Sequence, residues 1–128
     1  MKKFFILFAL VSSSCFAEVD VNNYSTSLDY AQVTEVTVSQ QSDKSWCFNV
    51  SIRHHDQGWE HYADGWEVLD LKGKQLGYRL LAHPHDNEQP FTRSLCGINI
   101  PTEQSKVIVR AKCNKHGYGG KALLVELK

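Results

Sequence analysis

The stretch Trp46-Cys47-Phe48-Asn49-Val50-Ser51-Ile52-Arg53 alternates between apolar and polar side chains, and this pattern decides the fold. Successive side chains of an extended strand point to opposite faces, so every second residue of the stretch would face a core. A helix would instead place its apolar residues three and four positions apart, and the chain has no long segment of that kind. The stretch therefore predicts a half-buried β-strand.

Similar alternation recurs along the rest of the chain, in segments separated by glycine- and proline-containing breakers. These further segments are 31–38, 65–72, 76–83, 91–99, 105–113 and 121–127. Seven short strands divided by turns are typical of a β-sandwich. The sequence thus predicts an all-β fold, an immunoglobulin-like β-sandwich of about seven antiparallel strands.

The first 17 residues are expected to be a secretory signal peptide and not part of this domain. Lys2 and Lys3 precede an apolar run that is too short to cross a bilayer, and a small-residue stretch ends at Ala17. A rival interpretation is a lipoprotein signal acylated at Cys15, although serine stands three positions before that cysteine. We expect a bacterial periplasmic or secreted protein with a signal peptide at 1–17, a loose N-terminal arm at 18–30 and a β-sandwich domain at 31–128.

The charge of the expected mature chain argues against one class of partner. Beyond Ala17 there are 12 basic and 14 acidic residues, which gives a slightly negative net charge with histidine neutral. A nucleic-acid-binding protein would be expected to present a basic face. No later segment resembles a membrane span, so the expected partners are a metal ion or an exported protein or glycan.

Three cysteines remain after the expected cleavage, and an oxidising compartment favours one disulfide with one thiol left over. In an immunoglobulin-like topology the strands at 46–53 and 91–99 are antiparallel neighbours, so Cys47 would face Cys96 on the outer, polar side of a sheet. Cys113 alternates with inner-face residues and is expected to be a buried free thiol. A Cys47–Cys113 bridge and a fully reduced chain remain alternatives.

All six histidines fall in three connections that this topology brings to one end of the sandwich. Neutral imidazole is a common ligand of zinc and copper, which makes a copper or zinc site at this end the leading hypothesis. The predicted metal ligands are His54, His61, His83, His85 and His116. Carboxylates that could bind the ion or orient its ligands are Asp56, Asp64, Asp86 and Glu88. His55 is expected to face solvent.

Other interpretations of the same loops remain open. The histidines and their polar neighbours could form a hydrogen-bond network that stiffens the loops without binding anything. Trp59 and Tyr62 could stack on a sugar ring or a peptide, whereas Trp66 is expected in the core. Arg93 lies on an inner face, where a charge must be paired, so it is predicted to organise the loops and less to bind an anion.

Enzyme activity has little support in the sequence. No serine or cysteine lies in a recognisable nucleophile turn, and no glycine-rich phosphate loop precedes a helix. Residues 117–120 fit a tight turn and not a nucleotide site. Acid–base chemistry by histidine with aspartate stays conceivable, but no single pair is singled out.

Several segments together form a distinctive combination: 58–68 (GWEHYADGWEV), 76–79 (LGYR), 83–85 (HPH), 88–95 (EQPFTRSL) and 116–120 (HGYGG). In these segments the chain resembles a group of small exported bacterial proteins of uncharacterised function. The resemblance covers about residues 54 to 120. It implies a small exported single-domain protein and carries over no activity, cofactor or site residue.

Overall fold

The alternating stretch forms β2 (Trp46–Arg53), the central strand of a three-stranded antiparallel sheet in the computed structural model, which describes residues 18–127. β1 (Gln32–Gln40) pairs with one edge of β2, and β5 (Phe91–Ile98) pairs with the other. The inward side chains Phe48, Val50 and Ile52 are fully buried, as the alternation predicts. The predicted signal peptide lies outside the described residues.

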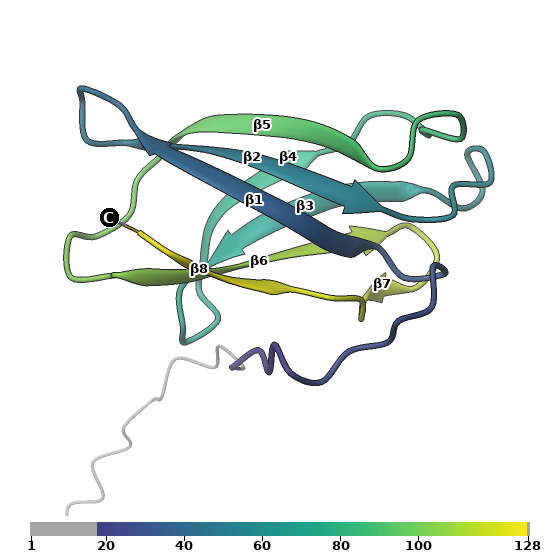
Figure 1. The fold of residues 1–128 in the computed structure, drawn as a ribbon, viewed down its shortest axis with the longest axis horizontal. Coiled ribbons are helices and arrows are strands. Elements are labelled where there is room, and N and C mark those ends of the chain that lie inside the picture. The colour runs from purple at the N-terminus through teal and green to yellow at the C-terminus, as the bar shows by residue number, and fades with distance from the viewer. Residues whose placement is uncertain (1–17, 128) are drawn as a thin grey trace, which may run out of the picture.

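The second sheet is built around the neighbouring strands β3 (Ala63–Leu69) and β6 (Lys106–Cys113). β4 (Gln75–Leu80) pairs with β3, while β7 (Gly117–Tyr118) and β8 (Leu123–Glu126) both pair with β6. Figure 1 shows the two sheets stacked one above the other. Across residues 18–127 the eight strands and near absence of helix confirm the predicted all-β sandwich.

The segment 117–120, expected to be a tight turn, is where the structure differs from the pattern: Gly117 and Tyr118 form β7 against β6, whereas the predicted strand at 121–127 contains β8. Residues 119–121 leave β6 and bond elsewhere: Val33 N–H donates to Lys121 O at 2.9 Å, and Ser25 N–H donates to Gly119 O at 2.8 Å. A Cβ on Gly120 would lie 2.1 Å from the carbonyl oxygen of Ala31, so this close approach requires glycine. The interruption joins the second sheet to β1 and to the residues before it.

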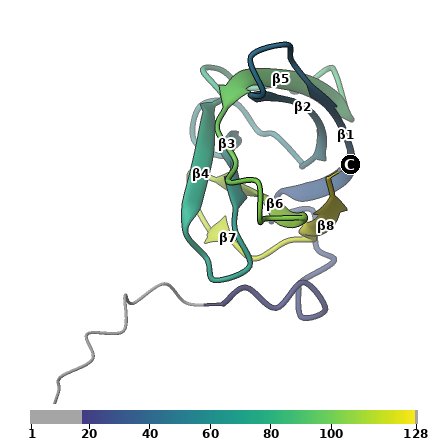
Figure 2. The same ribbon diagram turned by 90° about the vertical axis from the view of Figure 1, so that its left-hand side faces the viewer.

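The core lies between the two sheets, which wrap around it in the end-on view of Figure 2. Its largest fully buried side chains are Trp66, Phe48 and Phe91. Trp66 therefore occupies the core as expected, and it is removed from any surface role. Burying a side chain of this kind stabilises the fold by about 1.5–3 kcal/mol.

The disulfide joins Cys47 to Cys96, which confirms the predicted pairing. The pairing register places both Cys96 and Gly97 of β5 opposite Cys47, between the Trp46–Ile98 and Phe48–Leu95 pairs. Gly97 has a φ of 74°, which suits such a bulge. Cys113, at the end of β6, is buried and forms no disulfide within the described residues.

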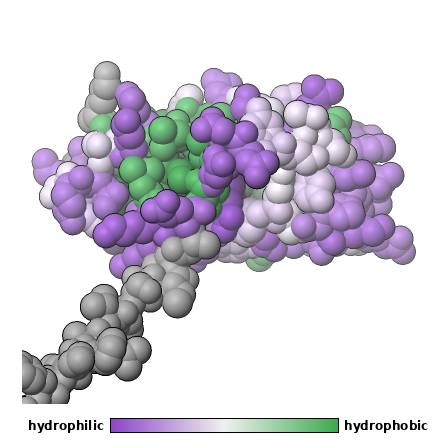
Figure 3. Space-filling view, turned by 90° about the horizontal axis from the view of Figure 1, so that it is seen from below, coloured by the Kyte–Doolittle hydropathy of each residue, from purple (hydrophilic) through white to green (hydrophobic). Residues whose placement is uncertain are grey.

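Residues 18–30 run along the outside of the second sheet towards one end of the sandwich. Val19 and Val21 pack against a small outer cluster of Leu69, Ile108 and Ala122. Figure 3 shows an apolar patch on this underside, close to where the described chain begins. Among residues 18–127, no helix is long and apolar enough to cross a bilayer.

Three connections meet at that same end, on the right in Figure 1: residues 54–62, 81–90 and 114–116. We call this end the histidine pole, because these connections contain all six histidines of the sequence. The β1–β2, β3–β4 and β5–β6 turns lie at the opposite end. The topology thus brings together three segments that are far apart in sequence.

Candidate metal centre

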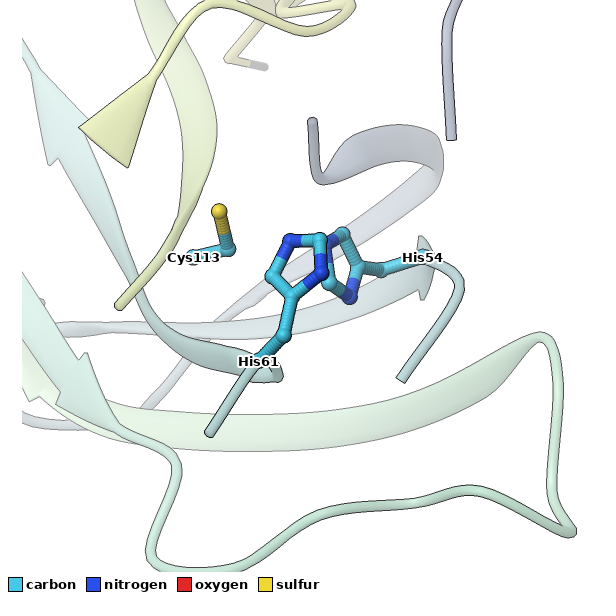
Figure 4. Close-up of side chains that lie close together, drawn as sticks. All are labelled: His54, His61 and Cys113. Carbon is cyan, nitrogen blue, oxygen red and sulfur yellow. The ribbon is translucent and has the colours of Figure 1, made fainter. Parts of the chain in front are cut away.

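Two buried histidines and one buried cysteine meet inside the histidine pole (Figure 4). His54 directly follows the inward-facing residues of β2 and is 1% exposed, while His61 precedes β3 and is 4% exposed. Their rings meet edge to face with centroids 4.6 Å apart, and the two Nε2 atoms are 3.2 Å apart. Cys113 is 2% exposed, and one ligand atom from each of the three residues lies within 4.8 Å of the others.

Oxygen acceptors fix the orientation of both rings through their Nδ1 atoms. Nδ1 of His54 lies 2.6 Å from Oδ1 of Asp56, and Nδ1 of His61 lies 3.0 Å from Oε1 of Gln57. An ionised carboxylate and an amide oxygen only accept hydrogen bonds, so each Nδ1 carries the proton. Each Nε2 therefore directs a lone pair towards the shared centre, in the arrangement seen for metal-bound histidine.

Asp56 is held as a carboxylate by its surroundings. Burial on its own would raise the pKa of this carboxyl, but hydrogen bonds from the His54 ring and from the backbone N–H groups of His85 and Ala63 outweigh burial and lower the pKa. Oδ1 accepts from Ala63 N–H at 3.0 Å, and Oδ2 accepts from His85 N–H at 2.7 Å. Asp56 is thus a charged acceptor that orients His54 and also ties down the 81–90 connection.

The backbone carbonyl oxygen of Asp29 is a fourth atom at the shared centre. It lies 3.1 Å from Nε2 of His54 and 3.2 Å from Nε2 of His61, and it accepts a hydrogen bond from the Cys113 S–H at 3.4 Å. Sγ of Cys113 also accepts a hydrogen bond from His116 N–H at 3.1 Å. The centre therefore consists of two imidazole nitrogens, a sulfur and a carbonyl oxygen, all in close contact.

These separations resemble the edges of a tetrahedral coordination shell. An ion about 2.0–2.1 Å from nitrogen or oxygen ligands in a regular tetrahedron would set those ligands about 3.3–3.4 Å apart. The nitrogen–nitrogen and oxygen–nitrogen separations are 3.1–3.2 Å. These separations are slightly shorter than the tetrahedral edges, and the sulfur lies within 4.8 Å of both nitrogens.

The other predicted histidine ligands lie outside this group. The His116 side chain is exposed and packs beside the centre, with its ring centroid 5.1 Å from that of His61. His83 and His85 pair with each other at 4.6 Å, and His85 stacks on Phe91 at 4.0 Å. The structure thus divides the five predicted ligands into a central pair, a neighbour of that pair, and a separate pair on the 81–90 connection.

His85 is buried without the polar contacts that orient His54. It is 6% exposed, and neither of its ring nitrogens has a hydrogen-bond partner among residues 18–127. Burial lowers the pKa of His85 below its usual value, and the nearby Arg93 guanidinium acts in the same direction, which outweighs the opposite effect of the Asp56 and Glu88 carboxylates. This imidazole therefore favours its neutral form.

The remaining predicted residues lie at the surface of the histidine pole. Trp59 is 66% exposed and meets Tyr62 edge to face at 5.6 Å, beside a hollow lined by residues 58–59 and 83–88. Arg93 lies 3.6 Å from the Glu88 carboxylate and 5.5 Å from the centroid of the Phe91 ring, so its charge has a partner. His55 is exposed, as expected.

The other candidate carboxylates are engaged elsewhere. Asp64 accepts hydrogen bonds from Lys112 Nζ at 3.0 and 3.1 Å, and Asp86 accepts from Gly58 N–H at 3.2 Å. Neither belongs to the group of close ligand atoms around His54 and His61. Of the four candidates, Asp56 is the one that contacts the central pair.

Sequence reasoning missed two members of the centre. Cys113 was expected only as a buried free thiol, although a reduced cysteine at a histidine-rich end of an exported chain is itself a signal for metal ligation. The Asp29 contribution comes from its backbone carbonyl, and no side-chain pattern reports which carbonyl will point into a site.

One curated relative gives an external comparison. A protein of Halomicrobium mukohataei described as "Putative lipoprotein" is 41% identical over 96 residues, which cover 75% of this chain and 47% of that protein. The chain thus spans about half the length of this relative. No family model and no solved structure matches the chain. Together with the disulfide, the relative points to an exported protein.

Proposed function

We propose that this protein is a small exported transition-metal-binding module, with zinc or copper held inside the histidine pole by His54, His61 and Cys113. The observation that carries this proposal is the contact of two Nε2 atoms, a thiol sulfur and a carbonyl oxygen inside the fold. Imidazole with thiolate is the donor set that zinc and copper prefer.

Hydrogen bonding within the cluster explains only part of this arrangement, since the Cys113 S–H donates to the Asp29 oxygen at 3.4 Å while both Nε2 atoms lack a donor. With both Nδ1 atoms donating outward, each Nε2 presents a lone pair, and the Asp29 oxygen can only accept. A buried polar atom left without a partner costs about 1–3 kcal/mol. A cation at the centre, with Cys113 bound as the thiolate, would satisfy both Nε2 lone pairs and the Asp29 oxygen at once.

The burial of the ligands favours binding or storage over catalysis. Catalytic zinc keeps an open position for water or substrate, whereas structural sites are closed by protein ligands. All three side-chain ligands are at least 96% buried, and residues 28–30 and His116 lie over them. The centre therefore resembles a closed site and offers no evident access for a substrate.

Elemental analysis of the untagged mature protein tests this function. We expect about one equivalent of zinc or copper, lost in His54→Ala and His61→Ala and retained in the matched control His55→Ala, whose side chain is exposed. Cys113→Ser, which keeps nearly the same side-chain size, should also lose the ion. Folded protein that takes up neither metal at micromolar concentration would refute the proposal.

A second candidate function is capture of a protein or glycan partner at the surface of the same pole. The 66% exposure of Trp59, next to the hollow lined by residues 83–88, favours it. Exposed aromatic rings of this kind are common anchors in binding sites. Here Trp59→Ala should abolish partner capture while leaving metal content and melting temperature unchanged.

The relative's description raises the question of membrane attachment. If the chain is itself a lipoprotein, cleavage precedes Cys15 and that residue carries the lipid. Intact mass of the exported protein decides between the alternatives. An unmodified chain beginning at Glu18 supports the signal peptide at 1–17, and an acylated chain beginning at Cys15 supports the lipoprotein.

A further inference from the structure

The N-terminal segment reaches the candidate centre through a backbone atom and not through a side chain. Asp29 lies before β1, in the segment that crosses the outside of the second sheet, and its side chain is exposed. Its carbonyl oxygen is nevertheless within 3.4 Å of all three candidate ligand atoms. The oxygen is as close to the two nitrogens as they are to each other.

We infer that the ion is zinc, that the Asp29 carbonyl oxygen is its fourth ligand, and that metal binding holds residues 28–30 against the histidine pole. This inference rests on the proposed metal-binding function. It adds the geometry of the site, the fourth donor and a mechanical role for the ion.

The choice of zinc follows from the shape of the donor set. A copper electron-transfer site has three strong ligands in a plane and a weak, long axial ligand, such as a backbone oxygen. Here the carbonyl oxygen lies 3.1 and 3.2 Å from the two nitrogens, which are 3.2 Å apart. The oxygen is therefore not set further away than the other donors, as a weak axial ligand would be. Nitrogen and oxygen donors at nearly equal separations favour an ion that binds the oxygen as closely as the nitrogens and has no redox role, and zinc is the usual example.

Without an ion, the Asp29 oxygen depends on its neighbours for a donor. Both imidazoles use their Nδ1 protons on Asp56 and Gln57, so the donor to the Asp29 oxygen is the weak S–H of Cys113 at 3.4 Å. Next to this oxygen, the backbone is attached to the pole by a hydrogen bond from His55 N–H to Leu28 O at 3.0 Å. A metal–oxygen bond would therefore be a major attachment of residues 28–30 to the pole.

The segment has a separate attachment that does not involve the centre. Nε2 of Gln32 donates to the carbonyl oxygens of Ser25, Ser27 and Tyr30, and Ser25 N–H donates to Gly119 O. Zinc removal should therefore loosen residues 28–30 locally and leave the segment associated with the domain. That outcome can be followed amide by amide.

Hydrogen exchange of the whole mature protein, with and without one equivalent of zinc, tests the inference. We expect zinc removal to speed exchange at the amides of Tyr30 and His55 by at least about tenfold. The amide of Gln41, which donates to Ser45 O in the β1–β2 turn at the opposite end, serves as the internal control and should be unaffected. The Cys113→Ser protein should behave like the zinc-free wild type even when zinc is added.

The outcomes separate this inference from the proposed function. If zinc binds through His54, His61 and Cys113 but exchange at Tyr30 and His55 does not change, the fourth-ligand inference falls and the metal-binding function stands. If the protein binds no zinc and no copper, both fall. If only copper is bound, the choice of zinc is overturned.

Discussion

His54 and His85 are both buried at the same pole and share one partner, yet their surroundings differ completely. Asp56 contacts the ring of His54 with Oδ1 and the backbone N–H of His85 with Oδ2. The His54 ring is oriented by that carboxylate, while the His85 ring lies flat on Phe91 with no polar partner among the described residues. Burial alone therefore does not prepare a histidine to bind a metal ion; an acceptor at the other ring nitrogen orients it for that role.

Replacing the oriented histidine should have the largest effect. His54→Leu removes the ring N–H that donates to the buried Asp56 carboxylate, and a hydrogen bond to a charged group contributes about 1.5–3 kcal/mol. Metal affinity should fall by more than about 100-fold. Losing only a residue that hydrogen-bonds to a metal ligand already lowers metal affinity by about 10–100-fold, and His54 is itself a proposed ligand. Chemical denaturation and a metal competition assay measure the two losses. Wild-type affinity in a folded His54→Leu protein would remove His54 from the site.

The ion itself should stabilise the fold by a measurable amount. At a free zinc concentration 100 times the dissociation constant, binding to the folded state alone adds about 2.7 kcal/mol. Thermal unfolding with and without chelator should show this gain for the wild type, and also for a His83→Ala/His85→Ala double variant. Cys113→Ser should show none. If the double variant folds but zinc no longer stabilises it, His83 or His85 belongs to the metal site.

Asp56→Asn tests the orienting role while keeping the size of the side chain. The amide still offers one oxygen but lacks the charge that holds the His54 ring, so metal affinity should fall by about 10–100-fold. Stability of the metal-free protein should also fall, because a charged acceptor of three hydrogen bonds becomes neutral. An unchanged dissociation constant in metal titration would show that the carboxylate does not tune the site.

Replacing His85, the histidine without polar contacts, should change stability only slightly and in the opposite direction to replacing His54. His85→Leu removes two buried ring nitrogens that lack partners, so stability should be unchanged or rise by up to about 1 kcal/mol. Metal affinity should stay within about twofold of wild type. Equilibrium denaturation of the metal-free protein measures the stability; a loss of several kcal/mol would mean that the ring has polar partners after all.

The same substitution should alter the dependence of stability on pH. The pKa of His85 is lower in the folded state than in the unfolded chain, so the unfolded state binds more protons and stability falls as pH drops below the ordinary histidine value. His85→Leu removes this contribution, and the decline in metal-free stability between about pH 7 and pH 5 should be shallower. An identical slope in both proteins would contradict the lowered pKa.

His55→Ala should have the smallest effect. The side chain is exposed, and its backbone N–H bond to Leu28 O survives the substitution. Stability should stay within about 0.5 kcal/mol and metal content should not change. A larger loss of either would show that the His55 side chain, and not only its backbone, supports the pole.

Much of the fold was predictable because burial follows the two-residue period of strands. The alternation in β2 placed the core residues and, through strand pairing, the Cys47–Cys96 disulfide. The segment between β6 and β8 was harder, since β7 and the break after it depend on backbone contacts of Gly119 and Lys121 with distant residues. The two-residue alternation of apolar side chains carries no information about such backbone contacts.

The location of the candidate site was predictable, but its membership was not. The topology brought the histidine-bearing connections to one end, as expected. Which histidines meet depends on loop conformation: His54 continues an inward-facing series, whereas His85 stacks on Phe91 and is drawn away from the centre. The Asp29 oxygen belongs to the backbone, so its place in the centre could be found only from the three-dimensional structure.

The most direct test of the account is zinc-edge X-ray absorption on the untagged mature protein loaded with one equivalent of zinc. The account predicts four scatterers, one sulfur at about 2.3 Å and three nitrogen or oxygen atoms at about 2.0–2.1 Å, with the sulfur lost in Cys113→Ser. A shell of five or six oxygen and nitrogen atoms without sulfur, in the wild-type protein, would contradict a metal centre built on His54, His61 and Cys113.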